Sequence, residues 1–173
     1  MTLQIQHILQ SRILVLDGAM GTMIQRYKLT EEQYKGERFK DIEKLQKGNC
    51  DLLTLTQPEI IEQIHRAYLE AGADIIETNT FNATSISMEN YGLQNYVSEI
   101  NIEAAKIARK IADEFTLKDP SKPRFVAGAI GPTNKTTSIK QTSANSRSVN
   151  FDDLRISYEE QIEALMDGGI DVI

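Results

Sequence analysis

The stretch YLEAGADIIETNTFNAT, residues 68–84, decides the fold class, because a helix-like pattern gives way at Gly72 to a short apolar run. The run, residues 73–77, ends in a carboxylate, and an amide and hydroxyls follow it at Asn79 and Thr80. A strand that only filled a core would not need these polar groups at its end. The stretch therefore predicts a βα unit whose strand carries chemistry at its carboxyl end.

Three other apolar segments share this strand-like character, since none of them alternates cleanly between apolar and polar residues. Continuous apolar runs suit strands that are covered on both faces of a parallel sheet. The four predicted strands are residues 12–16, 73–77, 124–129 and 170–173. Helical periodicity is present between them, over residues 58–71, 97–115 and 151–166. This order predicts an α/β fold with right-handed crossovers.

A short pattern occurs twice, each time where a predicted helix leads into a strand. Residues 70–76, EAGADII, are echoed by residues 167–173, DGGIDVI. Both have a glycine, then an aspartate (Asp74 and Asp171), then a β-branched run. Short turns of this kind are typical of βα units, so the two strands are predicted to have the same structural role. Asn150 is the predicted N-cap of the last helix.

Composition excludes several function classes. The net charge is −6, which argues against a nucleic-acid partner bound through a basic face. No apolar run approaches the roughly 20 residues of a membrane helix, and the N-terminal residues lack the pattern of a signal peptide. A cytoplasmic location, without nucleic-acid or membrane partners, is therefore predicted.

The single cysteine and the two histidines give no metal site by themselves. Cys50 cannot form an internal disulfide, nor a Cys-rich zinc site alone, and its surroundings suggest a loop. An ordinary reduced thiol is favoured over a reactive nucleophile. His7 and His65 have no second ligand at metal spacing, so surface or packing roles are predicted for both.

Two strand ends carry the candidate binding residues. Asp17-Gly18-Ala19-Met20 follows the first strand, where Asp17 could accept hydrogen bonds from an ammonium group and the backbone amides could bind a carboxylate. The alternative is a capped turn in which Asp17 bonds its own backbone. Glu77, Asn79 and Thr80 follow the second strand, where the alternative is a solvated loop that caps the next helix. For the turn Gly128–Asn134, after the third strand, turn geometry is favoured over binding.

Three motifs together resemble a known family: ILVLDGAMGTMIQ from residue 13, GNCDLLTLTQPEIIEQIHRAYLEAGADIIETNTF from residue 48, and VAGAIGPTNKTTSI from residue 126. They resemble the homocysteine S-methyltransferases, and most closely the homocysteine-binding domain of the cobalamin-dependent methionine synthases. The family fold is a (β/α)8 barrel. The resemblance implies that residues 1–173 are about four βα units, the first half of such a barrel, truncated in strand four.

The resemblance also implies a chemistry. Homocysteine would be held by Asp17, Gly18, Ala19, Met20, Glu77, Asn79 and Thr80. A zinc ion bound by three cysteines would stabilise the homocysteine thiolate, which takes a methyl group from methylcobalamin, recharged by methyltetrahydrofolate, to give methionine. Those cysteines are expected beyond Ile173, so this fragment is predicted to contain no catalytic residue, to bind no metal or cobalamin, and to be inactive alone. Its implied partners are homocysteine, the rest of the barrel, and folate, cobalamin and activation domains.

Two alternatives stay open at this point. The chain could be a non-catalytic α/β binding domain that kept the sheet and lost the metal. It could also be a magnesium-dependent lyase-type barrel that uses Asp17 and Glu77 as carboxylate ligands. The polar segment 133–149 is predicted to be a long βα loop, either functional or disordered, and no residue of it is assigned to the site. The fragment itself is expected to be aggregated, dimeric or loosely packed.

Overall fold

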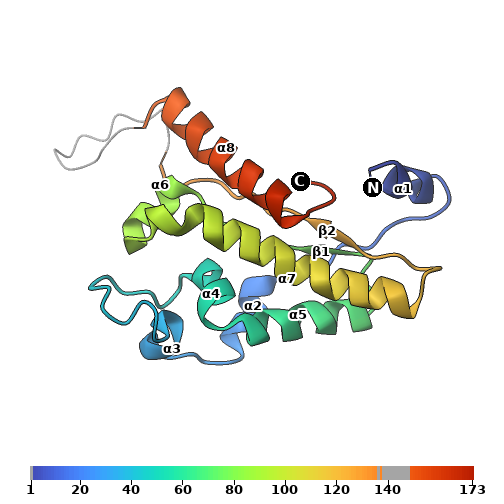
Figure 1. The fold of residues 1–173 in the computed structure, drawn as a ribbon, viewed down its shortest axis with the longest axis horizontal. Helices are drawn as coiled ribbons and strands as arrows, with labels where there is room; N and C mark the ends of the chain where they lie inside the picture. Colours follow the sequence, from blue (N-terminus) through green and yellow to red (C-terminus); the bar gives the residue numbers. More distant parts are fainter. Residues whose placement is uncertain (1, 136, 138–148) are drawn as a thin grey trace.

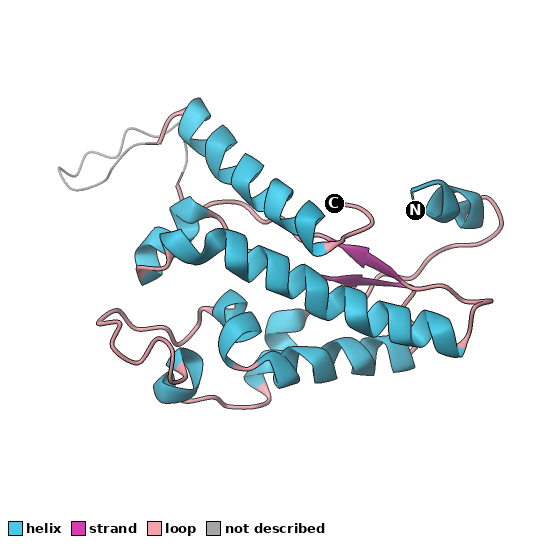
Figure 2. Ribbon diagram, in the orientation of Figure 1, coloured by secondary structure: helices cyan, strands magenta, loops and turns pink. Residues whose placement is uncertain are grey.

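The computed structural model of the chain describes residues 2–135, 137 and 149–173. Figure 1 shows three long helices, α5 (Pro58–Glu70), α7 (Val97–Lys118) and α8 (Phe151–Gly168), lying together on the near side of a small sheet formed by β1 (Ile75–Glu77) and β2 (Phe125–Ala127). The same arrangement is visible by element type in Figure 2. Most of the predicted polar loop, residues 133–149, lies outside the described residues.

The long helices and the strands alternate from residue 58 onward, as expected of an α/β protein, and shorter helices lie before and between them. The α-helices are α1 (Thr2–Leu9), α2 (Met20–Gln25), α3 (Glu31–Lys35), α4 (Leu53–Thr56), α5 (Pro58–Glu70), α6 (Ser85–Met88), α7 (Val97–Lys118) and α8 (Phe151–Gly168). The strands are β1 (Ile75–Glu77) and β2 (Phe125–Ala127), and the 3-10 helices are η1 (Cys50–Leu52), η2 (Glu89–Tyr91) and η3 (Gln94–Tyr96). No described helix is long and apolar enough to cross a membrane.

The sheet has two parallel strands rather than the four predicted. In β1 and β2, Ile75 is paired with Phe125 and Glu77 with Ala127. The other two predicted strands contribute one parallel bridge each, Leu16 to Ile75 and Ala127 to Val172. Each of these segments has a hydrogen-bonded neighbour on one side only in the described structure, and backbone hydrogen bonds such as Asp17 amide to Ile75 carbonyl (2.9 Å) and Gly128 amide to Val172 carbonyl (2.8 Å) accompany each bridge.

The predicted burial of the first segment is also wrong. Ile13, Val15 and Leu16 are 86%, 54% and 48% exposed. This segment lies at the edge of the sheet, and among the described residues no further strand pairs with it there. The interior strands behave as predicted, since Ile76 and Val126 are fully buried and pack against α5 and α7 side chains such as Leu69 and Ile111.

The repeated aspartates do have the same structural role. Asp74 accepts hydrogen bonds from the amide of Val15 (2.9 Å) and from the guanidinium of Arg12 (2.9 Å for each nitrogen). Asp171 accepts from the amide of Val126 (2.8 Å) and from Arg109 (2.7 Å). In both cases the carboxylate at the start of one strand segment bonds the backbone of the preceding one. The aspartate in each copy of the repeated pattern therefore sets the register of two neighbouring strand segments.

The three long predicted helices are confirmed, with small differences at their ends. Gly72 follows α5 with a φ of 111°, in the left-handed region that favours glycine. Asn150 is the N-cap of α8 and forms a reciprocal pair of hydrogen bonds with Asp153, 2.9 and 3.0 Å long. The short helices α1, α2 and α3 were not predicted, because none of them is long enough to show a clear period.

Gly168 allows α7 and α8 to pack closely, and its replacement is expected to destabilise the fold. A Cβ at this position would lie 2.4 Å from the Cβ of Ala105 and 2.7 Å from the carbonyl oxygen of Ile102. Gly168→Ala should therefore lower the free energy of unfolding by about 1–3 kcal/mol, measured by chemical denaturation. Gly21→Ala in α2 is the control: no atom lies within 4 Å of its Cβ, so helix propensity should raise stability slightly. Equal effects of the two changes would contradict this account.

Candidate functional site

A pocket of about 460 Å³ lies at the carboxyl ends of β1 and β2. Three walls form it: the segment that follows Leu16, the turn η1, and the loops after the two strands. Its lining residues are Asp17, Gly18, Ala19, Met20, Gly21, Cys50, Asp51, Glu77, Thr78, Asn79, Thr80, Phe81, Asn82 and Ala129. This is the edge at which parallel α/β sheets bind their ligands.

Asp17 joins the first wall to the end of β1. The backbone amide of Glu77 donates to both carboxylate oxygens of Asp17, at 3.2 and 3.1 Å. The pKa of Asp17 is raised to about 7, chiefly by burial and to a smaller extent by the neighbouring charge of Glu77, while the hydrogen bond from the Glu77 amide opposes the shift. A positively charged group placed in the pocket would stabilise the ionised form of Asp17.

Gly18, Ala19 and Met20 bring backbone close to the pocket. A Cβ on Gly18 would lie 3.3 Å from the hydroxyl of Tyr68, which also donates to the carbonyl of Ala19 (3.4 Å). Met20 is the first residue of α2, and the first amides of a helix have no partner within the helix. These amides are therefore free to serve a ligand at this wall.

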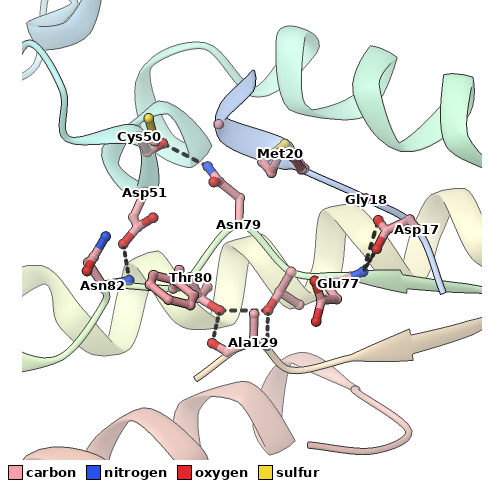
Figure 3. Close-up of a pocket in the computed structure, with 14 residues that line it drawn as sticks. Asp17, Gly18, Met20, Cys50, Asp51, Glu77, Asn79, Thr80, Asn82 and Ala129 are labelled. Carbon is pink, nitrogen blue, oxygen red and sulfur yellow. Dashed lines mark hydrogen bonds between the residues drawn. The ribbon is translucent and has the colours of Figure 1, made fainter. Parts of the chain in front are cut away.

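Asn79 and Thr80 line the pocket, but their side chains also form hydrogen bonds that connect its walls. Asn79 Nδ2 donates to the carbonyl of Cys50 (2.8 Å), which connects β1 to η1. Thr80 Oγ1 donates to the carbonyl of Ala129 (2.8 Å), and Thr78 Oγ1 accepts from the Ala129 amide (2.9 Å). Figure 3 shows these bonds between the loops after β1 and β2. Both loops are thus held at fixed positions around the cavity.

Two buried side-chain amides, one from α7 and one from α8, form hydrogen bonds to the loop that follows β1. Gln161 Nε2 donates to the carbonyl of Thr80 (2.8 Å), and Asn101 Nδ2 donates to the carbonyl of Ala83 (2.8 Å). Both side chains are fully buried. Buried polar side chains are costly unless they are bonded, and here Asn101 bonds the Ala83 carbonyl while Gln161 gives the Thr80 carbonyl a second donor besides the Ala83 amide. The rigid helices therefore position the loop that lines the pocket.

A match to a protein family covers this pocket. The family described as homocysteine S-methyltransferase matches residues 14–173. The chain belongs to the homocysteine S-methyltransferase family. The match includes all of the pocket-lining residues.

Solved structures of homocysteine methyltransferase MmuM from Escherichia coli share the fold of this homocysteine S-methyltransferase chain. The metallated form has 20% sequence identity and a TM-score of 0.71, over 96% of this chain and 55% of that one. The oxidised form has 22% identity and a TM-score of 0.70, over 95% and 53%. The apo form has 22% identity and a TM-score of 0.60, over 95% and 49%. The chain thus spans about half the length of the structures it matches.

The seven predicted site residues come together in this one pocket of the homocysteine S-methyltransferase fold. That they bind substrate stays a prediction. Sequence reasoning missed the contributions of Gly21, Cys50, Asp51, Thr78, Phe81, Asn82 and Ala129. Most of these lie next to a predicted residue, but η1 and Ala129 were absent from the expected site, since turn geometry was favoured over binding for the turn that contains Ala129. The signal for η1 was the pair Cys50-Asp51, polar residues directly before the buried Leu52 and Leu53.

Among the residues considered as metal or nucleophile candidates, Cys50 has other surroundings than predicted, whereas His65 does not. Cys50 is half-buried in η1 rather than in a loop, and burial, together with the charge of Asp51, raises the pKa of its thiol. His65 is fully buried in α5, neither ring nitrogen has a hydrogen-bond partner in the described structure, and burial lowers its pKa to about 4. The packing role predicted for His65 agrees with this position, whereas Cys50 is a poor source of thiolate.

Proposed function

We propose that this chain is the homocysteine-binding part of a methionine synthase, formed by the first half of a (β/α)8 barrel. The reaction of the whole protein would transfer a methyl group from methylcobalamin, recharged by methyltetrahydrofolate, to the sulfur of homocysteine. One observation carries the proposal: a chain of the homocysteine S-methyltransferase family places a carboxylate and a run of backbone amides side by side in a pocket at its strand ends.

The wall from Asp17 to Met20 suits the head group of an α-amino acid. Asp17, already fixed by the Glu77 amide, would accept hydrogen bonds from the ammonium group. The amides of Ala19 and Met20, at the start of α2, would donate to the carboxylate. Gly18 allows the Tyr68 ring to pack against this backbone, since a Cβ on Gly18 would lie 3.3 Å from the Tyr68 hydroxyl. Both the ammonium group and the carboxylate group of the ligand would therefore be bound.

The metal proposed for the whole protein does not fit the residues described here. No three His, Cys, Asp or Glu side chains gather in metal-binding positions among residues 2–135, 137 and 149–173. Cys50, the one cysteine, has a raised thiol pKa rather than the lowered one of a zinc ligand. Zinc would thus be held by cysteines outside this chain, and cobalamin by another domain. In this proposal the chain's own contribution is to bind and orient homocysteine.

A magnesium-dependent lyase-type site is the second candidate, because Asp17 and Glu77 do lie in one pocket. Magnesium prefers oxygen ligands in octahedral geometry and keeps several waters. Calorimetric titration of the full chain with Mg²⁺ distinguishes the homocysteine-binding site from the magnesium-dependent one. Under the leading proposal, Mg²⁺ shows no saturable binding and does not change homocysteine affinity. A magnesium requirement for ligand binding would favour the second candidate.

Homocysteine binding by the full chain is the direct test of the leading proposal. Calorimetric titration should show one saturable site, and Asp17→Asn should weaken binding about tenfold or more, because the ammonium loses a charged acceptor. The control is Asp113→Asn, which changes an exposed carboxylate on α7 and should leave the affinity unchanged. Binding that is absent in the unmodified chain, or equal in both variants, would contradict the proposal.

A further inference from the structure

The sequence Asp-Gly occurs twice in the chain, at Asp17-Gly18 and at Asp167-Gly168. In such a pair the backbone nitrogen of the glycine can attack the carboxyl carbon of the preceding aspartate, because glycine has no Cβ to obstruct the approach. The first pair lies in the wall of the pocket, and the second lies at the end of α8. The surroundings of the two pairs therefore decide which of them can react.

The peptide group between Asp17 and Gly18 is open to this attack. Gly18 is exposed, and among the described residues no hydrogen bond engages the carbonyl of Asp17 or the amide of Gly18. The chain is fixed on either side of this peptide group. The Asp17 amide donates to the carbonyl of Ile75 (2.9 Å), and the carbonyl of Ala19 accepts from the Met23 amide (3.3 Å). The peptide group can thus turn until its nitrogen approaches the side chain of Asp17.

The carboxyl group of Asp17 is also partly in the form that reacts. A neutral carboxyl group can release water when a nitrogen attacks it, whereas a carboxylate repels the nucleophile and lacks this leaving group. Burial, together with the facing charge of Glu77, raises the pKa of Asp17 to about 7, so a proton is retained at neutral pH. The hydrogen bonds from the Glu77 amide, 3.2 and 3.1 Å long (Figure 3), restrain the side chain, but they weaken when the carboxyl group is neutral.

The second pair is protected by its place in the fold. Asp167 and Gly168 lie in the last turn of α8, so the peptide group between them belongs to the helix and its nitrogen takes part in helical hydrogen bonding. Gly168 is also buried against α7, where a Cβ would lie 2.4 Å from the Cβ of Ala105. The helix would have to open locally before this nitrogen could reach the carboxyl group of Asp167.

We propose that Asp17 is a modification site of this chain, at which aspartate isomerises to isoaspartate through a cyclic imide. The nitrogen of Gly18 forms a bond to the carboxyl carbon of Asp17, the bond from that carbon to its hydroxyl oxygen breaks, and the hydroxyl leaves as water with the amide proton. Water then opens the imide at the former main-chain carbonyl, so the chain continues through the side-chain carbon and no atom is gained or lost overall.

This inference does not depend on the proposed function, but it affects the same wall of the pocket. Isoaspartate places one additional methylene group in the backbone and moves the free carboxylate onto the Cα atom. The carboxylate of Asp17 and the backbone from Gly18 to Met20 would then no longer have the positions that they have in the pocket. The site is therefore altered by a reaction that needs no enzyme and no reagent other than water.

The test compares the two Asp-Gly pairs within the same molecules after incubation of the full chain at neutral pH. Trypsin cleavage after Arg12 and Arg26 releases Asp17 in the peptide 13–26, and cleavage after Arg155 releases Asp167 in the peptide 156–173. Isoaspartate changes the chromatographic elution of a peptide without changing its mass, and fragmentation locates it. Isoaspartate should accumulate at Asp17 about tenfold or more faster than at Asp167, because the second site reacts only after local opening of α8.

The denatured chain provides the control. Neither pair keeps its surroundings there, so the two rates should become similar. Gly18→Ala should slow the reaction at Asp17, since its methyl group obstructs the attacking nitrogen, and thermal unfolding verifies that this variant keeps the fold. Equal rates at Asp17 and Asp167 in the folded chain, a reaction at Asp17 in the denatured chain alone, or an unchanged rate in Gly18→Ala would each overturn the inference.

Discussion

Asp171→Ala is expected to lower the free energy of unfolding by about 3–5 kcal/mol, because it removes the buried carboxylate partner of Arg109 and, with it, the acceptor of a buried strand amide. The side chain of Asp171 is 0% exposed, and Arg109, its partner at 2.7 Å, is 16% exposed. The same carboxylate oxygen accepts the amide of Val126, so the change also leaves a strand amide without its bond. Urea denaturation followed by circular dichroism measures the loss.

Asp113→Ala provides the control, since Asp113 pairs with the same guanidinium at 2.8 Å from the exposed side. Its side chain is 60% exposed, and exposed ion pairs contribute at most about 1 kcal/mol. A large difference between the two variants is therefore expected, although each removes one carboxylate from Arg109. A loss of similar size in both would show that the pairing of Asp171 with the backbone is not what holds the strands in register.

The arrangement of the core was predictable because its signals are local. The apolar runs around Ile76 and Val126, the long helical periods and the glycine after α5 each depend on neighbouring residues alone. The extent of the sheet was not predictable in this way. A strand exists only where another strand pairs with it, and the segments around Leu16 and Val172 have one such neighbour each in the described structure. Their sequences are strand-like, but their pairing is limited to single bridges.

The candidate site, too, was predictable only where its position follows from a local sequence pattern. Asp17 and Glu77 could be predicted to lie close together because both follow parallel strand segments, and the ends of such segments meet at one edge. Asp51 could not, since no strand precedes it, and it reaches the pocket only because η1 folds against the loop after β1 through Asn79 and Asn82. Contacts of this kind join residues about 30 positions apart in the chain. No local pattern encodes them.

Asp51→Asn is expected to make the protein more stable above pH 7 and to have little effect below pH 4. Burial raises the pKa of Asp51 from 3.8 to about 7 in the folded state, and the Asn82 hydrogen bond offsets only part of this shift. Between these two values the folded protein keeps a proton that the unfolded chain has lost, so stability falls as the pH rises. The Asn side chain escapes this penalty, which amounts to roughly 2–4 kcal/mol above pH 7.

Chemical denaturation at several pH values between 4 and 8 measures this effect. The two ionisable neighbours of Asp51 do not titrate in this range, because burial raises the pKa of both the Cys50 thiol and the Tyr91 phenol.

Asp74→Asn should have the opposite dependence of stability on pH. Burial by itself would raise the pKa of Asp74, but the hydrogen bonds from Arg12 and the Val15 amide outweigh it and lower the pKa. Its ionised form therefore stabilises the fold above pH 4, so Asp74→Asn loses stability at pH 8, and the loss shrinks as the pH falls. If Asp51→Asn lost stability at pH 8 as well, the carboxylate would be a structural acceptor rather than a group that destabilises the fold when it is ionised.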